Sequence, residues 1–323
     1  MESGLSSPST DTSAPDVMKP RLIVNPVSGA DAAPDYLPEL NERLRAAFGE
    51  LDIAMTVAAG DALNLARRAA EEGCERLFVA GGDGTLNEVL NGVAAVPSAL
   101  GRVTFGVIPL GTGNDFAAAL GLPEDAGRAV EVMLGGRTLR TDVGVVNGRH
   151  FVNVSAGGFI AEVSDAVNPQ LKTIAGKFAY IIGGAQVLLE YEPVAARLRA
   201  VLEDGSEVAR ETGVQMFAVC NSRLVGGGRP IAPGALINDG ALDVCVVEAV
   251  PTLEFVRLLG SVADGGHIED ERVAFFRARE VELRFDRRIK VNTDGEVLEA
   301  DECRYHVLPR AARFLAGDAP FAQ

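Results

Sequence analysis

The chain has 323 residues, of which 47% are hydrophobic and 23% charged, a composition typical of globular proteins large enough for two domains. Its formal net charge of −15 argues against a nucleic-acid partner, because nonspecific nucleic-acid binding requires a basic surface. The same charge opposes strong electrostatic attachment to an anionic membrane. Contact with a membrane surface is therefore expected to be local and transient.

Cysteine usage and the apolar segments indicate a reducing, cytoplasmic environment. The four cysteines lie far apart in the sequence and form no CxxC pair, so neither a zinc site nor a secreted disulfide framework is predicted. Residues 1–18 are rich in Ser, Thr, Pro and Asp and are predicted to form a disordered tail without a signal peptide. The most apolar stretch, residues 178–189, is too short to span a membrane.

From residue 21 onward, short apolar runs alternate with segments of helical periodicity. The pattern predicts strands at 21–24, 52–57, 76–80 and 103–108, and helices at 37–48, 61–72, 85–93 and 114–120. Such alternation with short loops is typical of a parallel sheet that is covered by helices on both faces. We therefore predict an N-terminal, doubly wound α/β domain over residues 19–140.

After residue 140, strands dominate the pattern. They are predicted at 141–146, 150–156, 194–202, 213–221, 242–247, 281–285 and 290–292, with helices at 171–189 and 252–263. This order predicts an antiparallel, β-sandwich-like domain over residues 141–303. The C-terminal segment, residues 304–323, contains one more strand, which could return to the first domain.

The most informative stretch is residues 81–88 (GGDGTLNE), which lies between a predicted strand and a predicted helix. Glycines at such a turn let backbone N–H groups close around a phosphate, and the helix N-terminus adds a partial positive charge. Thr85 could cap the helix or contact a phosphate oxygen, and Asp83 could contact a nucleotide or its Mg²⁺. A lone turn of this kind is equally compatible with a structural turn that binds no ligand.

Two further polar, glycine-containing loops follow predicted strands, at residues 25–29 (NPVSG) and 109–115 (PLGTGND). The carboxyl ends of parallel strands meet at one edge of the sheet, where open α/β folds bind ligands. Three such loops at one edge predict a nucleotide site. The chain has neither the GxxxxGK[ST] nor the GxGxxG pattern, so the loops would hold phosphate without a P-loop lysine.

In this order the three loops resemble the signature loops of the diacylglycerol kinase catalytic-domain family, which includes bacterial lipid kinases and the sphingosine and ceramide kinases. The resemblance continues through residues 153–159, 172–180, 226–228 and 233–243, and covers about residues 21–315. It implies that ATP binds between two domains, on the loops of the first. The residues that it assigns to the nucleotide site are Asn25, Pro26, Ser28, Gly29, Thr56, Gly81, Gly82, Asp83, Gly84, Thr85, Asn87, Glu88, Gly111, Thr112, Gly113, Asn114 and Asp115.

The resemblance places the general base of the family at Asp294, within residues 292–296 (NTDGE). Asp294 would accept the proton of the attacking hydroxyl while Mg²⁺ bridges the ATP phosphates. Glu296 would assist with metal binding or with orientation. From the residues alone, an Asp-Gly hairpin turn without a catalytic role explains the same segment.

The resemblance also implies a structural Mg²⁺ in the second domain. Its ligands would be the side chain of Asp239 and the backbone carbonyls of Leu236 and Ala241, a set of oxygen atoms that suits Mg²⁺. The alternative is an Asn-Asp-Gly turn that binds no metal.

The predicted helix at 171–189 carries Lys172 and Lys177 near its start and is mostly apolar after them. It could flank a lipid entrance, with the lysines meeting a phosphate or a headgroup. A helix that packs on the core with two solvated lysines is an equal alternative.

Together these features predict an ATP- and Mg²⁺-dependent lipid kinase that phosphorylates a hydroxyl group of a diacylglycerol-like lipid. The protein would be cytoplasmic and peripheral to the membrane, with a homodimer as the default assembly. One alternative is a kinase of a soluble substrate, similar to NAD kinases, which share the GGDGT turn. The other is a nucleotide-binding regulator without catalysis.

Overall fold

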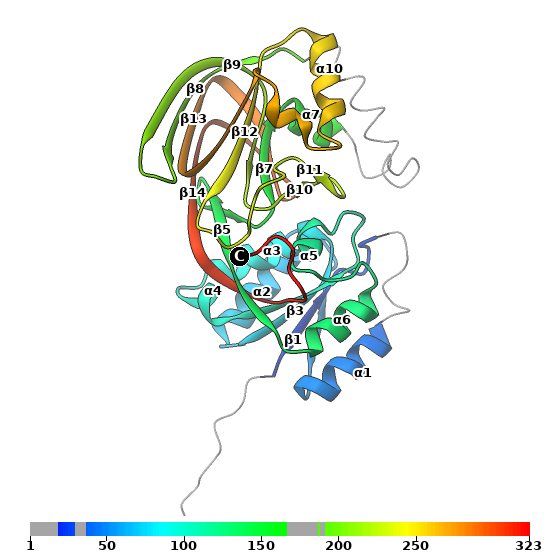
Figure 1. Cartoon of the computed structure of the whole chain (residues 1–323). Helices are drawn as coiled ribbons and strands as arrows, with labels where there is room; N and C mark the ends of the chain where they lie inside the picture. The colour runs from blue at the N-terminus through cyan, green and yellow to red at the C-terminus, as the bar shows by residue number, and fades with distance from the viewer. Residues whose placement is uncertain (1–18, 30–36, 167–186, 188–190) are drawn as a thin grey trace, which may run out of the picture.

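The computed structural model describes residues 19–29, 37–166, 187 and 191–323. The chain forms two lobes, one built from parallel strands and helices and the other from long antiparallel strands (Figure 1). The predicted tail at 1–18 and, apart from Val187, the predicted helix at 171–189 lie outside the described residues.

The first lobe contains a parallel sheet with the strand order β4-β3-β1-β2. Its strands are β1 (Arg21–Val24), β2 (Asp52–Met55), β3 (Arg76–Gly81) and β4 (Thr104–Pro109). Its helices are α1 (Leu37–Phe48), α2 (Asp61–Glu71), α3 (Asp83–Ala94), α4 (Ala99–Arg102), α5 (Asp115–Ala119) and α6 (Ala126–Leu134). One apolar core joins the sheet to the helices and includes Leu22, Phe78 and Phe105.

Helices α4 and α6 are absent from the elements that the sequence predicts. Helix α6 begins at an N-cap residue, Asp125, whose side chain accepts a hydrogen bond from the backbone N–H of Arg128 at 2.8 Å. It buries Ala129, Val130 and Met133 against the sheet. The capping aspartate and the apolar residues at i, i+1 and i+4 indicate this helix, but its nine residues give only a short periodic pattern.

The second lobe is mainly antiparallel. Its strands are β5 (Thr138–Val146), β6 (Arg149–Phe151), β7 (Val154–Gly158), β8 (Val194–Leu202), β9 (Glu207–Cys220), β10 (Leu224–Val225), β11 (Arg229–Pro230), β12 (Leu242–Glu248), β13 (Val273–Thr293) and β14 (Glu296–Leu315). Strand β8 alternates buried and exposed residues, which is the pattern of a sheet with one face on a core.

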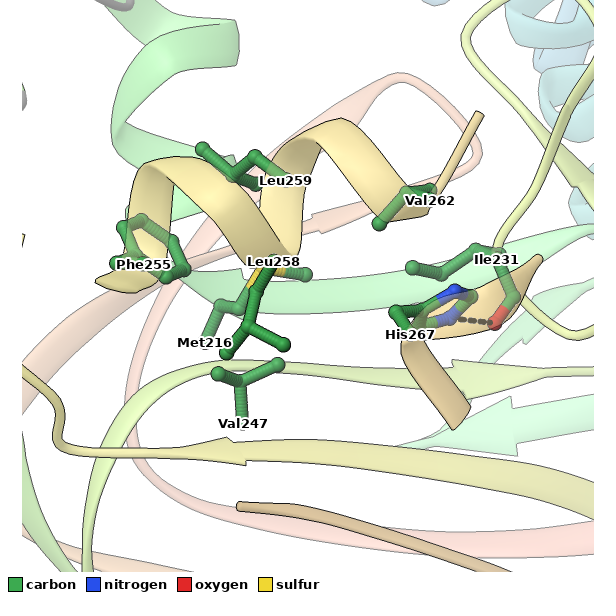
Figure 2. Close-up of a pocket in the computed structure, with 8 residues that line it drawn as sticks. All are labelled: Met216, Ile231, Val247, Phe255, Leu258, Leu259, Val262 and His267. Carbon is green, nitrogen blue, oxygen red and sulfur yellow. Dashed lines mark hydrogen bonds between the residues drawn. The ribbon is translucent and has the colours of Figure 1, made fainter. Parts of the chain in front are cut away.

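Helices cover part of this lobe. They are α7 (Phe159–Ala166), α10 (Thr252–Ser261) and a 3₁₀ turn (Gly266–Glu269). Phe255 and Leu258 of α10 point toward Met216 and Val247 on the strands below, and Nε2 of His267 lies 3.0 Å from the carbonyl oxygen of Ile231 (Figure 2). An apolar layer therefore separates the helices from the sheet.

Two predicted strand patterns in the second lobe were wrong in detail. The strand predicted at 150–156 is interrupted at Val152 and Asn153, because the N–H groups of these residues bond to Asp294 instead of a neighbouring strand. The strands predicted at 281–285 and 290–292 belong to the single strand β13, whose pairing with β14 is irregular between Arg284 and Ile289.

Strand β14 joins the two lobes. Along most of its length it pairs with β13 and β5, and near its end Arg313 and Phe314 pair in parallel with Thr104 and Phe105 of β4. The predicted fold class, a parallel α/β sheet followed by an antiparallel sandwich-like part, is thereby confirmed. In the part of the chain that the structure describes, no helix has the length and apolarity needed to cross a membrane.

Candidate active site

The three glycine-containing loops meet at the carboxyl ends of β1, β3 and β4. A Cβ atom built on Gly111 would lie 2.6 Å from the Cα atom of Gly82, and one built on Gly29 would lie 2.1 Å from the carbonyl oxygen of Leu110. Only glycine permits these approaches. The side chain of Asn25 donates a hydrogen bond to Oγ1 of Thr85 at 3.0 Å. The predicted convergence of the loops is therefore a property of the structure.

Helix α3 begins at Asp83, two residues earlier than the sequence pattern predicts. Its N-cap residue is Gly82, which has no side chain to bond the N–H groups of the first turn. Thr85 is buried within that turn and accepts from Asn25, so it does not cap the helix. The exposed dipole end of α3 faces the loops, an arrangement suited to a phosphate.

Two carboxylates, of half-buried Asp83 and buried Asp115, connect these loops to each other and to the second lobe. Asp83 accepts hydrogen bonds from the N–H groups of Asp115 at 3.1 Å and Phe116 at 3.2 Å, and from Nδ2 of Asn153 at 3.1 Å. Asp115 accepts from the N–H groups of Gly227 at 3.1 Å and Gly228 at 2.7 Å. Burial raises the pKa of Asp115, and the glycine N–H groups oppose that rise.

Asp294 lies in the turn between β13 and β14 with a φ of 47°, and its side chain enters the interior between the lobes. Its carboxylate accepts hydrogen bonds from three successive backbone N–H groups: Val152 at 2.7 Å, Asn153 at 3.1 Å and Val154 at 2.8 Å. Burial raises the pKa of Asp294 to about 6, whereas the three N–H groups favour the ionised form.

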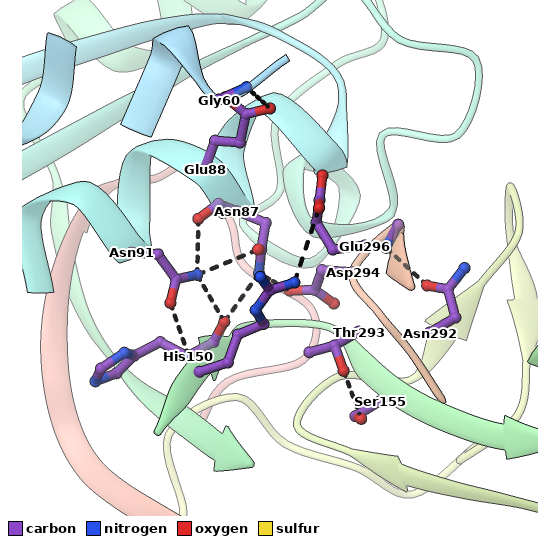
Figure 3. Close-up of polar contacts among 12 residues, drawn as sticks. Gly60, Asn87, Glu88, Asn91, His150, Ser155, Asn292, Thr293, Asp294 and Glu296 are labelled. Atoms are coloured by element: carbon purple, nitrogen blue, oxygen red, sulfur yellow. Dashed lines mark hydrogen bonds and ion pairs between the residues drawn. The ribbon is translucent and has the colours of Figure 1, made fainter. Parts of the chain in front are cut away.

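The turn that carries Asp294 lies directly against the glycine-containing loop at residues 81–84. A Cβ atom built on Gly295, whose φ is 97°, would lie 3.7 Å from the Cα atom of Gly84. Nδ2 of Asn87 lies 3.4 Å from Oδ2 of Asp294 (Figure 3). Asp294 and the N-terminus of α3 therefore belong to one site, although more than 200 residues separate them in the sequence.

Three other predicted site residues make contacts of their own. Glu296 faces Arg149, with 3.7 Å between Oε2 and Nη1, and both side chains are partly exposed. Oε1 of Glu88 accepts from the N–H group of Gly60 at 3.1 Å. The side chain of Asn114 closes the loop by accepting from the N–H group of Gly111 at 2.9 Å.

Sequence reasoning missed two features of the site. The first is the run 152–154, whose backbone N–H groups hold Asp294 and which has no side-chain signature for that role. The second is Asn91, whose side chain bonds to Asn87 and to His150. Asn87 and Asn91 are spaced i, i+4 on an otherwise largely apolar helix, a pattern that could have indicated a shared polar contact.

The predicted metal loop lies away from this site. The side chain of Asp239 is 3% exposed, and it contacts the guanidinium group of Arg277 and accepts from the N–H group of Ala241 at 3.2 Å. Arg277 thus already balances the charge of Asp239. Among the described residues there is no cluster of three or more His, Cys, Asp or Glu residues suited to a metal ion.

Comparisons with known proteins agree with this architecture. Residues 19–146 match the family model of the diacylglycerol kinase catalytic domain, and residues 153–316 match that of the YegS C-terminal NAD kinase beta sandwich-like domain. A diacylglycerol kinase of Bacillus subtilis (strain 168) is 35% identical over 277 residues, which cover 85% of this chain and 89% of that protein. The diacylglycerol kinase of Staphylococcus carnosus (strain TM300) is 37% identical over 276 residues, covering 85% of this chain and 88% of that protein.

Solved structures show the same relationship. The crystal structure of a putative diacylglycerol kinase from Bacillus anthracis str. Sterne superposes with a TM-score of 0.78 at 28% sequence identity, over 93% of this chain and 98% of that one. With both family models matched and identities above one third over most of the chain, the protein belongs to the diacylglycerol kinase catalytic-domain family.

Proposed function

We propose that the protein transfers the γ-phosphoryl group of ATP to the hydroxyl group of a diacylglycerol-like lipid. The family and the names of its relatives support a lipid kinase. The proposed catalysis rests on the position of Asp294, a buried carboxylate that adjoins the N-terminus of α3. A base within reach of bound phosphate is the arrangement that hydroxyl phosphorylation requires.

The nucleotide would lie on the three loops, with its phosphates at the N-terminus of α3. Val27 and Val57 follow the neighbouring strands β1 and β2 and are 86% and 92% exposed. Two exposed apolar side chains at one sheet edge suit the flat face of an adenine base. Thr56, whose N–H group donates to the carbonyl of Val24 at 2.9 Å, fixes the start of the second of these loops.

Asp294 would act as the general base. Its ionised carboxylate accepts the proton of the lipid hydroxyl while the hydroxyl oxygen bonds to the γ-phosphorus and the bond from that phosphorus to the bridging oxygen breaks, so that ADP leaves. Of the four donors to this carboxylate, Asn87 is the most distant at 3.4 Å. An incoming hydroxyl can displace that contact while the three backbone N–H groups keep the carboxylate in place.

Mg²⁺ bound with the ATP phosphates would neutralise the charge that develops on them. Asp83 and Asp115 lie in two of the three glycine-containing loops, and each accepts backbone N–H groups from neighbouring turns. A structural Mg²⁺ at Asp239, Leu236 and Ala241 would have to share the carboxylate with Arg277. Comparing thermal unfolding in Mg²⁺ and in chelator, for the wild type and Asp239→Asn, tests that site without an activity assay.

The acyl chains would lie in the apolar layer between the sheet and the helices α7 and α10. This layer begins at Val154, whose N–H group holds Asp294, and continues through Phe159 to Phe255. The cavity beneath α10 has a volume of about 10 Å³, too small for an acyl chain. The helices must therefore move apart when a lipid enters.

An assay of acceptor choice tests the proposed function. The purified protein is incubated with labelled ATP, Mg²⁺ and a panel of lipids in mixed micelles, beside NAD and a control without acceptor. Transfer to a diacylglycerol supports the proposal. Transfer to NAD alone would instead establish a kinase of a soluble substrate. NAD is included because the second family model is described as NAD kinase-like. Tight ATP binding without transfer would favour a regulator.

A further inference from the structure

The side chain of Asn91 makes two hydrogen bonds to the backbone of His150 (Figure 3). Its Oδ1 accepts a hydrogen bond from the N–H group of His150 at 2.9 Å, and its Nδ2 donates to the carbonyl oxygen of the same residue at 2.9 Å. The amide therefore pairs with both backbone groups of one residue, as a residue on a neighbouring antiparallel strand would. Asn91 belongs to α3 and His150 to β6, so this contact joins the two lobes.

Asparagine at position 91 does not favour the helical conformation of α3. Asparagine is a poor helix former because its side chain competes for backbone hydrogen bonds. Here Nδ2 also donates to the carbonyl oxygen of Asn87 at 2.9 Å and lies 3.1 Å from Oδ1 of Asn87. The contacts to β6 and to Asn87 thus use every polar atom of a side chain that the helix itself does not require.

The residue that Asn91 contacts, His150, lies just before the residues whose N–H groups hold Asp294. Val152, the first of those donors, follows His150 by two residues. On its other edge β6 pairs with β5, where His150 is opposite Val145. The segment that holds Asp294 is therefore fixed from one side by β5 and from the other by α3.

The same helix presents its N-terminus to the phosphate loops. Helix α3 begins at Asp83, and Asn91 lies two turns further along it. Asn87, one turn from Asn91, contacts both the carbonyl oxygen of His150 at 2.9 Å and Oδ2 of Asp294 at 3.4 Å. One rigid helix thereby connects the phosphate end of the site to the segment that positions the carboxylate.

We propose that Asn91 is a positioning residue, which sets the distance between the phosphate-binding end of α3 and Asp294 through its two-point contact with His150. This inference rests on the proposed role of Asp294 as the base. Asn91 itself does not contact Asp294, and it reaches the stretch 81–88 only through its hydrogen bonds to Asn87. Its effect should therefore fall on the chemical step and not on nucleotide binding, because a reacting group displaced by about 1 Å loses on the order of 100-fold in rate.

The test uses Asn91→Ala in the full-length protein. Alanine is a better helix former, so α3 should remain folded. We expect kcat for lipid phosphorylation to fall by roughly 10- to 100-fold, with the KM for ATP changed by less than about twofold. Hydrogen exchange should become faster at the amides of Val152, Asn153 and Val154, which a purely local loss at α3 would leave unchanged.

Two further variants keep the test decisive. Asn91→Asp has nearly the same volume and keeps an acceptor for the N–H group of His150, but its carboxylate repels the carbonyl oxygen, so kcat should again fall. Asn147→Gly is the matched control. Asn147, in the turn between β5 and β6, also makes two side-chain contacts to backbone, to the carbonyl of Glu302 at 2.7 Å and the N–H group of Arg304 at 2.9 Å. Glycine accepts its φ of 49°.

The proposal is overturned if both Asn91 variants keep wild-type kcat, or if Asn147→Gly lowers kcat as much as they do. Asp294→Asn, assayed in parallel, separates this inference from the function beneath it. If Asp294→Asn is inactive and the Asn91 variants are normal, only the positioning role is lost. If Asp294→Asn remains active, the base assignment is lost, and the positioning role with it.

Discussion

Asp294 and Val154 exchange two hydrogen bonds although they are 140 positions apart in the sequence. The N–H group of Val154 donates to Oδ1 of Asp294 at 2.8 Å, and the N–H group of Asp294 donates to the carbonyl oxygen of Val154 at 3.1 Å. The main chain of each residue therefore fixes the other. This reciprocity holds a carboxylate still in a place where its burial is unfavourable.

The state of that carboxylate should set the acid limit of the reaction. Burial raises the pKa of Asp294 to about 6, above the ordinary value for an aspartate. A general base acts only when ionised, so kcat should be lost as the pH falls through about 6 and should be constant above it. A pH–rate profile measured at saturating ATP and lipid checks this. A profile that stays flat down to pH of about 4 would contradict it.

Three buried hydroxyl groups form a chain of contacts beside the turn that carries Asp294. Oγ of Ser155 lies 2.8 Å from Oγ1 of Thr293 and 3.1 Å from the hydroxyl oxygen of Tyr305, and all three residues are buried. Replacing Thr293 with Val keeps the shape and leaves Ser155 short of one partner, which typically costs about 1–3 kcal/mol. Thr293→Val should therefore lower the free energy of unfolding in a denaturant titration. An unchanged value would mean that the hydroxyl chain does not stabilise the turn.

The contact between the glycine-containing loops at residues 81–84 and 109–115 should depend on glycine. In Gly111→Ala the added Cβ would lie 2.6 Å from the Cα atom of Gly82 and would force the loops apart. Overpacking of this kind typically costs about 1–3 kcal/mol, so we expect the KM for ATP to rise by about tenfold. Steady-state kinetics with varied ATP measures this rise.

Gly234→Ala is the matched control for that variant. A Cβ atom on Gly234 would meet nothing within 4 Å, and its φ lies outside the left-handed region. It should therefore leave the KM for ATP unchanged. Equal effects of the two alanines would refute the loop contact as the cause.

The outer face of α10 is the place where we expect the second lobe to touch a membrane. Leu253 and Val256 are 65% and 44% exposed, one helical turn apart, above the apolar layer. Each would contribute on the order of 1 kcal/mol on entering the interface, so each change to Ser should lower activity on vesicles by about fivefold. The rate with a dispersed short-chain diacylglycerol should not change.

Leu134→Ser is the control for this face. Leu134 is 37% exposed on α6 of the first lobe, away from α10. If it lowers vesicle activity as much as the changes on α10, the membrane contact does not lie where we expect it.

The sequence predicted the parts of the molecule that depend on local signals. The strands of the first lobe, predicted to within two residues at each end, and the three glycine-containing loops are local patterns, and glycine at close approaches leaves a mark in the sequence. Among the parts that depend on long-range contacts, the residues that hold Asp294 were not predicted. The N–H groups of residues 152–154 carry no side-chain signal, and their use by Asp294 interrupts the strand that the apolar pattern predicts.

The length of β13 illustrates the same limit. Residues 286–288 are charged and the pairing is irregular between Arg284 and Ile289, so the apolar pattern divides one strand into two. The sequence pattern does not reveal which strands β14 pairs with, because partners such as Arg313 and Thr104 are more than 200 residues apart. The boundary between the two predicted domains remains a prediction.

The most direct test of the account is phosphoryl transfer by Asp294→Asn, beside ATP binding measured by calorimetry. Asparagine keeps the shape of the side chain but cannot accept the proton of the lipid hydroxyl. Asp286→Asn, on an exposed position of the same strand, is the control. We predict that Asp294→Asn loses about 10²–10⁴-fold in transfer rate while its affinity for ATP and the activity of the control stay at wild-type values. Transfer by Asp294→Asn at a rate close to that of the wild type would contradict Asp294 as the base.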